Sequence, residues 1–244
     1  MLWTHNDSDA PVLFRIDRSG RAAPVTIAGA EVRDWEDLAT GPCGGPAFAA
    51  NAASARQACL YIADIGDNQE SRDRITIYEV PIPAPGSAST QAASAIHLRY
   101  PDAPHDAEAL LVSGSAQLQL SPVIFVITKE VPARVYRFQA SQNAGETATL
   151  AFVRTLNEKG RITGAAASPD GRWVALRSNR ALFVYAVDSF LKGGDPVRVD
   201  LAAFKEPQGE GVAFGSGGEL YLVSEGGGKN AAGMLTQIRC AFIR

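Results

Sequence analysis

Acidic side chains recur at the start of similar segments of this sequence, where carboxylate oxygens could bind a metal ion. The segments open at residues 34–39, 105–110, 162–167 and 209–214. When these openings are aligned, one position is occupied by Glu36, Glu108, Thr163 and Glu210. Hard cations such as calcium prefer several oxygen ligands, so carboxylates brought together from separate segments would suit such an ion.

A second set of polar residues follows the first apolar run of each segment. The set comprises Asp64 and Asp67, Lys129 and Glu130, Arg177, and Glu225, with Asn6 and Asp7 in the N-terminal segment. In an antiparallel pair, the start of the first strand lies beside the end of the second. The expected neighbours are therefore Glu36 with Asp64 and Asp67, Glu108 with Lys129 and Glu130, Thr163 with Arg177, and Glu210 with Glu225.

The repeated segments predict an all-β fold. Each apolar run is rich in β-branched and aromatic residues, and helical periodicity is almost absent outside residues 188–192. Radial repetition of small antiparallel sheets gives a β-propeller around a central channel. The repeat count predicts five blades in a single domain over residues 1–244. A sixth blade could be missing or lie in the Pro-, Ala- and Ser-rich segment 81–104.

The N-terminal segment reads as the fifth copy of the repeat without its opening. Residues 2–5 end in Asn6 and Asp7 and are followed by a second strand at 12–16. The first blade is therefore predicted to lack its inner strand. If the first strands of the other blades line the channel, the candidate residues converge at one mouth of that channel.

Charge and hydropathy exclude two classes of partner. A formal net charge of -3 gives no reason to expect binding to nucleic acid or to an anionic membrane surface. No run of about 18 apolar residues occurs, so we expect no membrane span. The N-terminus shows no basic segment followed by an apolar one, so no signal peptide is visible and a cytoplasmic location is one alternative.

The three cysteines, Cys43, Cys59 and Cys240, lack the close spacing of a zinc site. We expect them to be small buried thiols. As an alternative, Cys43 and Cys59 flank one loop and one strand and could pair in an oxidising compartment, which would argue for export.

Several pieces of the sequence carry a resemblance to a known group of proteins. Residues 2–8, 34–39, 61–68 and 100–110 resemble uncharacterised bacterial β-propeller proteins, which are often exported. More distantly, the chain is similar to phytase-type propellers, which hold calcium with carboxylates, and to gluconolactonase-type propellers, which hold one divalent metal at the channel mouth. The resemblance implies a periplasmic or secreted location. It also implies metal ligands among Glu36, Asp64, Asp67, Glu108 and Glu210, although Thr163 departs from the acidic pattern.

Two functions remain open from the sequence. The first is a hydrolase of phosphoesters or lactones that depends on calcium or another divalent cation. Its small, anionic substrate would be bound by Asn6, Asp7, Lys129, Glu130, Arg177 and Glu225. The second is a non-catalytic propeller that binds a ligand or a protein partner, with a structural metal or none. There the acids cap turns, and Lys129 and Arg177 balance their charge.

Overall fold

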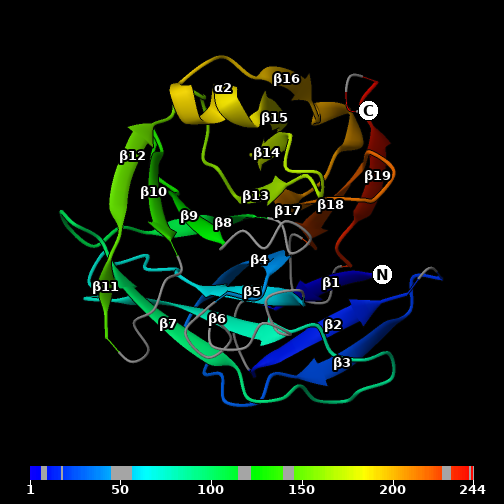
Figure 1. Ribbon diagram of the computed structural model, residues 1–244. Helices are drawn as coiled ribbons and strands as arrows, with labels where there is room; N and C mark the ends of the chain where they lie inside the picture. The colour runs from blue at the N-terminus through cyan, green and yellow to red at the C-terminus, as the bar shows by residue number, and fades with distance from the viewer. Residues whose placement is uncertain are drawn as a thin grey trace.

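The computed structural model describes residues 1–6, 10–17, 19–44, 57–114, 122–139, 146–226, 232–241 and 243. In this part of the chain, five small sheets are arranged around a common axis as the blades of a β-propeller (Figure 1). The described helices are short, with α2 (Val187–Lys192) spanning 6 residues and η2 (Ala202–Phe204) spanning 3. The predicted all-β propeller with five blades is confirmed.

Each blade is an antiparallel meander of strands that mostly follow one another in the chain. Blade one contains β1 (Leu2–His5), β2 (Val12–Ile16) and β3 (Ala22–Thr26). Blade two contains β4 (Trp35–Pro42), β5 (Ala58–Asp64), β6 (Ile75–Pro81) and β7 (Ser94–Arg99), to which the short β11 (Ala148–Thr149) adds in parallel. Since β7 is the outer strand of blade two, segment 81–104 contributes to that blade and not to a sixth.

The remaining blades follow the same plan. Blade three contains β8 (Ala107–Ser113), β9 (Val123–Thr128), β10 (Arg134–Gln139) and β12 (Ala151–Thr155). Blade four contains β13 (Gly164–Ala167), β14 (Trp173–Arg177), β15 (Ala181–Ala186) and β16 (Val197–Asp200). Blade five contains β17 (Gln208–Phe214), β18 (Glu219–Glu225) and β19 (Leu235–Arg239). Blades five and one, which carry the two chain ends, lie on the same side of the molecule (Figure 1).

Strands β4, β8, β13 and β17 pack side by side around the axis and are the inner strands of their blades. Strand β1 contacts β4 less extensively than these inner strands contact one another. Two second strands make a similarly small contact with the inner strand of the following blade: β5 with β8, and β14 with β17. Strand β1 therefore occupies a second-strand position, as predicted from the incomplete first copy of the repeat.

Apolar side chains between neighbouring blades form the core. Trp35 is fully buried and packs in one cluster with Leu13 and Ile62 between blades one and two. Leu111 and Leu176 belong to another cluster, between blades three and four. Burying one large apolar side chain stabilises the fold by about 1.5–3 kcal/mol. This packing fixes the inner strands relative to one another and so determines which openings meet at the channel.

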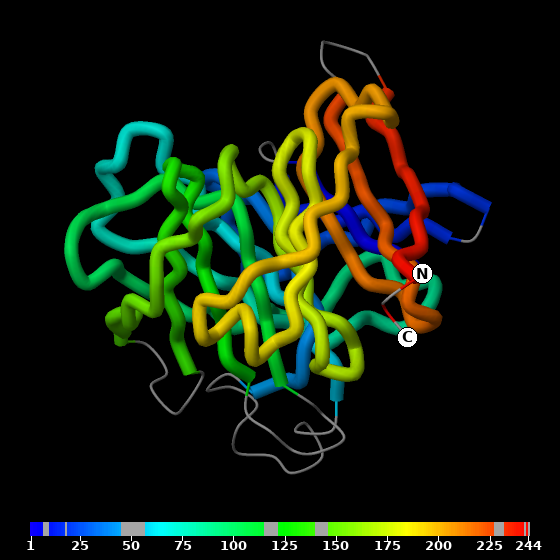
Figure 2. Tube along the Cα trace, turned by 90° about the horizontal axis from the view of Figure 1, so that it is seen from above, coloured from blue at the N-terminus to red at the C-terminus, as the bar shows by residue number. Residues whose placement is uncertain are grey.

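The two ends of the propeller are formed by different segments, and the disulfide lies at one of them. The loop after β5, drawn in cyan, lies at one end, and the last residues of β4 lie at the opposite end (Figure 2). At this second end a disulfide joins Cys43 to Cys59, so the expectation of free thiols was wrong for these two, whereas Cys240 is free and half-buried. A disulfide is typical of an oxidising compartment.

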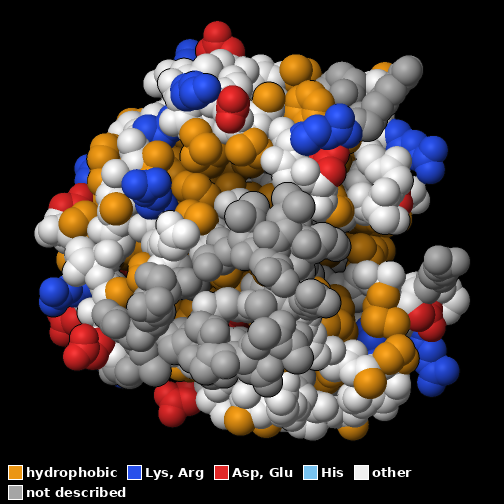
Figure 3. All heavy atoms as spheres, in the orientation of Figure 1, with side chains coloured by type: hydrophobic (Ala, Val, Ile, Leu, Met, Phe, Trp, Pro, Cys, Tyr) orange, Lys and Arg blue, Asp and Glu red, His pale blue; other side chains and the backbone are white. Residues whose placement is uncertain are grey.

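The surface of the described residues shows no gathering of one charge on the face in view. Charged side chains are scattered along the rim of this face, with apolar side chains between them (Figure 3). None of the described helices is long and apolar enough to cross a membrane. The groups that could perform chemistry are instead found around the first residues of the inner strands.

Candidate functional site at the acidic mouth

A β-bulge interrupts the start of three inner strands. The register shifts between Trp35 and Asp37 in β4, between Ala107 and Ala109 in β8, and between Gly209 and Gly211 in β17. The extra residues are Glu36, Glu108 and Glu210, which the aligned openings place at one position. A bulge re-aims a side chain at the edge of a sheet. We call this end of the channel the acidic mouth, defined by Glu36, Glu108 and Glu210.

Lys129 lies among the carboxylates contributed by blades two and three. Its Nζ forms an ion pair with Glu108 and lies 3.5 Å from Asp106 Oδ2. Burial lowers the pKa of Lys129, but the hydrogen bond and charge of Glu108, with the charges of Asp106 and Glu36, more than offset this and raise it. The expected meeting of Glu108 with Lys129 is therefore observed, and Glu36 is close enough to act on the same ammonium group.

Burial of Glu108 has a chemical consequence. Only 8% of the residue is exposed, and this burial raises the pKa of its carboxyl group even though Lys129 opposes the rise. A carboxyl group with a raised pKa exchanges a proton more readily near neutral pH. Glu108 can therefore act as a general acid or base as well as an oxygen ligand.

Gly66 allows two further carboxylates to approach each other. A Cβ atom at position 66 would overlap Glu36 Oε1 and Asp34 Oδ2, so both oxygens lie against the bare backbone of this glycine. The Gly66 N–H donates to the carbonyl of Asp34 at 3.2 Å, which holds the two segments together. Beside them is a polar hollow of about 290 Å³. It is lined by Arg33, Asp34, Gly66, Asp67, Asn68, Gln69, Ser71 and Arg72.

Asp64 is engaged in contacts that shape this loop. Its carboxylate accepts hydrogen bonds from the backbone N–H groups of Arg33 and Asp34, at 3.1 and 3.3 Å. It also pairs with Arg72 at 2.8 Å, and both side chains are 4% exposed. Asp64 lies opposite Trp35 in the ladder and so beside Glu36, as expected. Its oxygens orient the segment that carries Asp34.

Asp67 has a similar supporting position. Its carboxylate accepts the backbone N–H groups of Ser71 and Arg72, each at 2.7 Å. Its own N–H donates to Asp106 Oδ1 at 2.8 Å, which ties the loop of blade two to the opening of blade three. Asp67 thereby positions Asp106 next to Lys129.

Arg177 has a different environment from Lys129, although both follow a second strand. It is fully buried and donates to the carbonyls of Gly211 and Val223, at 2.7 and 2.8 Å. It also forms an ion pair with Glu206, whose side chain is 2% exposed. A Cβ at position 209 would overlap the guanidinium, so Gly209 is required for this contact. Arg177 thus joins blade four to blade five, and its guanidinium is not presented to the channel solvent.

Thr163 continues this packing arrangement at the opening of blade four. Its N–H donates to the carbonyl of Arg177 at 2.9 Å, which confirms that the two are neighbours. Its hydroxyl donates to the carbonyl of Gly209 at 2.7 Å. Glu210 is half-buried at the neighbouring bulge, where its charge acts on Arg177 and Asp37. Glu225 is exposed and pairs with Gln208 in the ladder.

Asp37 is a functional candidate that the sequence reasoning missed. Its Oδ1 accepts the N–H of Leu38 at 2.8 Å, and its Oδ2 accepts those of Leu110 and Ala165, at 2.8 and 3.2 Å. The carboxylate thus joins β4, β8 and β13 at the axis. Burial raises the pKa of Asp37 to about 7, against the opposing effect of these hydrogen bonds. The sequence did contain a signal for Asp37, because the aligned openings have a small residue at its position, such as Ala109 in blade three.

Three further residues were predicted to bind the substrate: Glu130, Asn6 and Asp7. Glu130 follows Lys129 in the turn between β9 and β10, where it pairs with Arg134 at 2.9 Å and lies 3.8 Å from His105. Asn6 is exposed after β1. Asp7 lies outside the described residues.

The donor set of the acidic mouth fits a hard cation in its chemistry. Carboxylates from two blades are gathered there. Burial and, to a smaller extent, the charge of Asp106 raise the pKa of Glu108, and a divalent ion would relieve the repulsion between these acids. In the described structure Lys129 already lies among them, and their oxygens do not form a set of three within 4.8 Å of one another. A cation at this place therefore has to exchange with the ammonium group of Lys129.

Comparisons with known proteins were made for sequence and for structure. No protein-family model and no curated protein matches this chain. The PQQ-bound aldose sugar dehydrogenase of Streptomyces coelicolor matches with a TM-score of 0.50 and 12% identity over 93% of this chain and 87% of that chain. A glucose dehydrogenase matches with a TM-score of 0.49 and 13% identity over 96% of this chain and 92% of that chain. A gluconolactonase of Xanthomonas campestris matches with a TM-score of 0.47 and 13% identity over 93% of this chain and 66% of that chain. At these identities the likeness extends to the propeller fold.

Proposed function

We propose that this propeller is a hydrolase that acts on lactones or phosphoesters of small molecules at the acidic mouth, with the help of a divalent cation. The observation that carries the proposal is the gathering of Glu36, Asp106 and Glu108 around one ammonium group at two neighbouring bulges. Such a concentration of carboxylates, one with a raised pKa, is typical of a site that binds a cation or transfers a proton.

The cation would be held by the carboxylates of Glu36 and Glu108, with Asp34 beside Glu36 over Gly66. When bound, it would polarise the carbonyl or phosphoryl oxygen of the substrate. Asp64 and Asp67 support this set, because they fix the backbone of Asp34 and the carboxylate of Asp106.

Lys129 and Glu108 would have distinct tasks in hydrolysis. The side chain of Lys129 is 23% exposed, so its ammonium can turn outward and meet an anionic oxygen of the substrate. Glu108 would then accept a proton from the attacking water through its second carboxylate oxygen. The polar hollow beside Asp34 would receive the part of the substrate that does not react.

A second candidate is a non-catalytic propeller that binds a ligand or a protein on the same end. The contact of Lys129 with both Glu108 and Asp106 favours it, since an internal cation balances the acids without a metal. The two candidates differ in whether a substrate is hydrolysed and in whether added calcium changes the rate of hydrolysis.

The test is hydrolysis of a panel of aldonolactones and phosphomonoesters, with calcium, magnesium or manganese, or with EDTA. We expect turnover by the wild type that EDTA abolishes, and a loss of about 100-fold or more in Glu108→Gln, the range for removal of a general acid or base. Asp188→Asn, whose side chain is 82% exposed in α2, is the matched control and should keep full activity. If no member of the panel is turned over with any ion, while the ion still binds, the non-catalytic candidate is favoured.

A further inference from the structure

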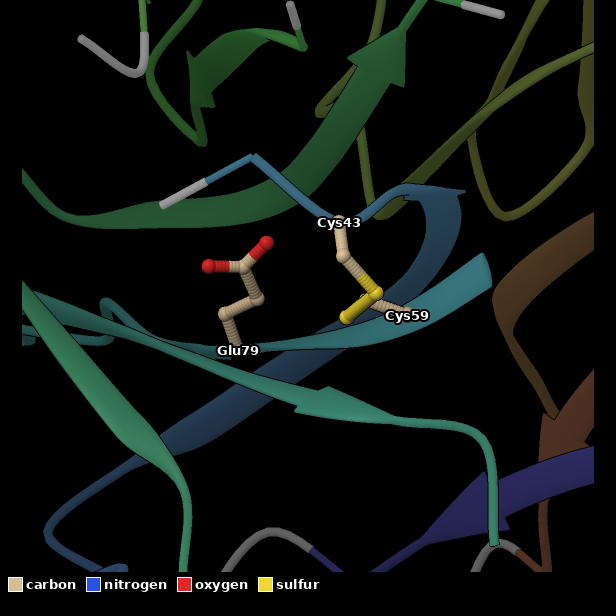
Figure 4. Close-up of side chains that lie close together, drawn as sticks. All are labelled: Cys43, Cys59 and Glu79. Atoms are coloured by element: carbon tan, nitrogen blue, oxygen red, sulfur yellow. A yellow bond between two sulfur atoms is a disulfide. The ribbon is translucent and has the colours of Figure 1, made fainter. Parts of the chain in front are cut away.

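Three residues that can bind metals meet at the opposite end of blade two. Cys43 follows β4, Cys59 belongs to β5 and Glu79 belongs to β6. One ligand atom of each lies within 4.8 Å of the others, and their exposure is 3%, 0% and 0%. Both sulfur atoms and the Glu79 carboxylate are directed into the same space next to the sheet (Figure 4). This is the one such group among the residues that the structure describes.

Glu79 places a carboxyl group in the interior of the protein. It is buried in the apolar cluster between blades two and three, where Tyr61 and Val112 pack. Taking a carboxylate out of water is unfavourable without compensating contacts. The Gly44 N–H donates to Glu79 Oε1 at 2.7 Å. The Tyr61 hydroxyl lies 2.7 Å from the same oxygen and 2.5 Å from the carbonyl oxygen of Pro42, and its single proton is shared between these two acceptors.

These two donors resemble the supporting contacts of a metal ligand. A ligating carboxylate is usually oriented by hydrogen bonds from neighbouring groups. The carboxylate is thus held in one orientation beside the two cysteines.

We propose that reduction of the Cys43–Cys59 disulfide converts this cluster into a binding site for a soft divalent cation such as zinc, held by the two thiolates and the Glu79 carboxylate. The Cα atoms of the cysteines are 5.0 Å apart, so small movements of the side chains let both sulfurs face one ion. Zinc is usually bound by four ligands, including cysteine sulfur and carboxylate oxygen, and water can supply the fourth.

The chemical steps balance with a dithiol as the reductant. The dithiol gives two electrons and two protons to the disulfide, so Cys43 and Cys59 become thiols and the dithiol becomes a cyclic disulfide. Zinc then displaces both thiol protons as it binds. The site is at the other end of the propeller from the acidic mouth, so this proposal does not depend on the proposed hydrolase function.

Cobalt(II) is the probe for the test, because its bonds to thiolate give intense absorption bands in the near ultraviolet. The full chain is reduced with a dithiol, freed of it by gel filtration without oxygen, and titrated with cobalt and then zinc. We expect one cobalt ion per reduced chain, with the thiolate bands removed by zinc, and no such bands in the oxidised protein. Two protons should be released for each zinc ion bound.

Variants assign the ligands. Cys59→Ser should abolish the thiolate bands of bound cobalt, and Glu79→Gln should weaken zinc binding by about tenfold or more. Cys240→Ser is the matched control, since this free thiol lies outside the cluster, and it should bind cobalt as the wild type does. Equal binding by Cys59→Ser and the wild type, or by the oxidised and reduced protein, would overturn the proposal.

Stability gives a second readout if reduction loosens the fold. Zinc that binds only the folded chain should raise the melting temperature of the reduced wild type and leave that of the oxidised protein unchanged. An identical melting temperature of the reduced protein with and without zinc, or a reduced protein that zinc does not refold, would contradict the assignment.

Discussion

The openings of blades three and four occupy the same place in the repeat but use it differently. At blade three a bulge turns Glu108 toward Lys129, whose side chain remains 23% exposed. At blade four the described register shows no bulge, and Thr163 and the fully buried Arg177 bond to backbone groups of blade five. One position of the repeat therefore serves a solvent-accessible charge cluster in one blade and the packing between blades in the next.

The difference shows that the repeat does not produce a symmetric ring of ligands. Blades two and three gather Glu36, Asp106 and Glu108 near Lys129, and Asp34 lies beside Glu36 at Gly66. Between blades four and five, Arg177 forms an ion pair with the buried Glu206 and donates hydrogen bonds to two backbone carbonyls. We infer that chemistry belongs to the first side of the acidic mouth and cohesion of the propeller to the second.

The largest effect on stability is expected from Arg177→Met. Removal of one partner of a buried ion pair leaves Glu206 charged and without Arg177, which typically costs about 3–5 kcal/mol. Urea unfolding of the variant measures the loss. The double variant Arg177→Met with Glu206→Gln should recover much of it. If Arg177→Met alone loses less than about 1 kcal/mol, Arg177 does not join the two blades as described.

Lys129→Met should strengthen cation binding at the acidic mouth. Unit charges 4 Å apart interact by about 4 kcal/mol near a protein surface, so removing the ammonium should tighten calcium binding by tenfold or more. Calorimetric titration measures the affinity. Lys192→Met is the matched control, because that side chain is 77% exposed at the end of α2 and should have no effect. Weaker binding in Lys129→Met would show that the ion does not compete with this lysine.

A smaller effect on affinity is expected from Gly66→Ala. The added Cβ must displace the carboxylate ends of Glu36 and Asp34, which are mobile enough to move without loss of the fold. We expect calcium affinity to fall by about fivefold, with the free energy of unfolding changed by less than about 1 kcal/mol. Unchanged affinity in the same titration would remove Asp34 from the site.

The smallest effect concerns an acid in the turn of blade four. The hydrogen bond from the Ser168 hydroxyl holds the pKa of Asp170 at about 2, below its usual 3.8, with help from Arg172. The lowered pKa stabilises the folded state above pH 3.8, and this contribution is lost as the pH falls to 2. Asp170→Asn should therefore cost about 0.5 kcal/mol at pH 7, because the ion pair is screened by solvent, and nothing at pH 2. Urea unfolding at both pH values checks the difference, and an equal cost at both would contradict the assigned pKa.

The architecture and the positions of the acids could be predicted from the sequence because both are repeated. The aligned openings placed Glu36, Glu108 and Glu210 at one position, and the structure shows that position as a bulge. Strand pairing within one repeat also placed Glu108 beside Lys129. Such contacts are local in the chain, so spacing alone determines them.

Contacts between repeats could not be predicted in the same way. Arg177 was a candidate for anion binding because its position matches that of Lys129, but its partner Glu206 comes from the segment before β17, 29 residues away. Asp37 bonds to strands of two other blades, up to 128 residues distant. Within blade two, the pairing of Cys43 with Cys59 was predicted only as an alternative, because the ends of β4 and β5 had to be known in space. No periodic pattern encodes these three-dimensional contacts.

The central claim is that the acidic mouth binds a divalent cation through blades two and three. The most direct measurement is the melting temperature of EDTA-treated protein, with and without calcium, magnesium or manganese, in the wild type, Glu36→Gln, Glu108→Gln and the control Asp188→Asn. An ion at a hundred times its dissociation constant stabilises the folded state by about 2.7 kcal/mol. We predict a rise in the wild type and the control that is lost in the other two variants. No rise with any ion, or an equal rise in all four proteins, would contradict the account.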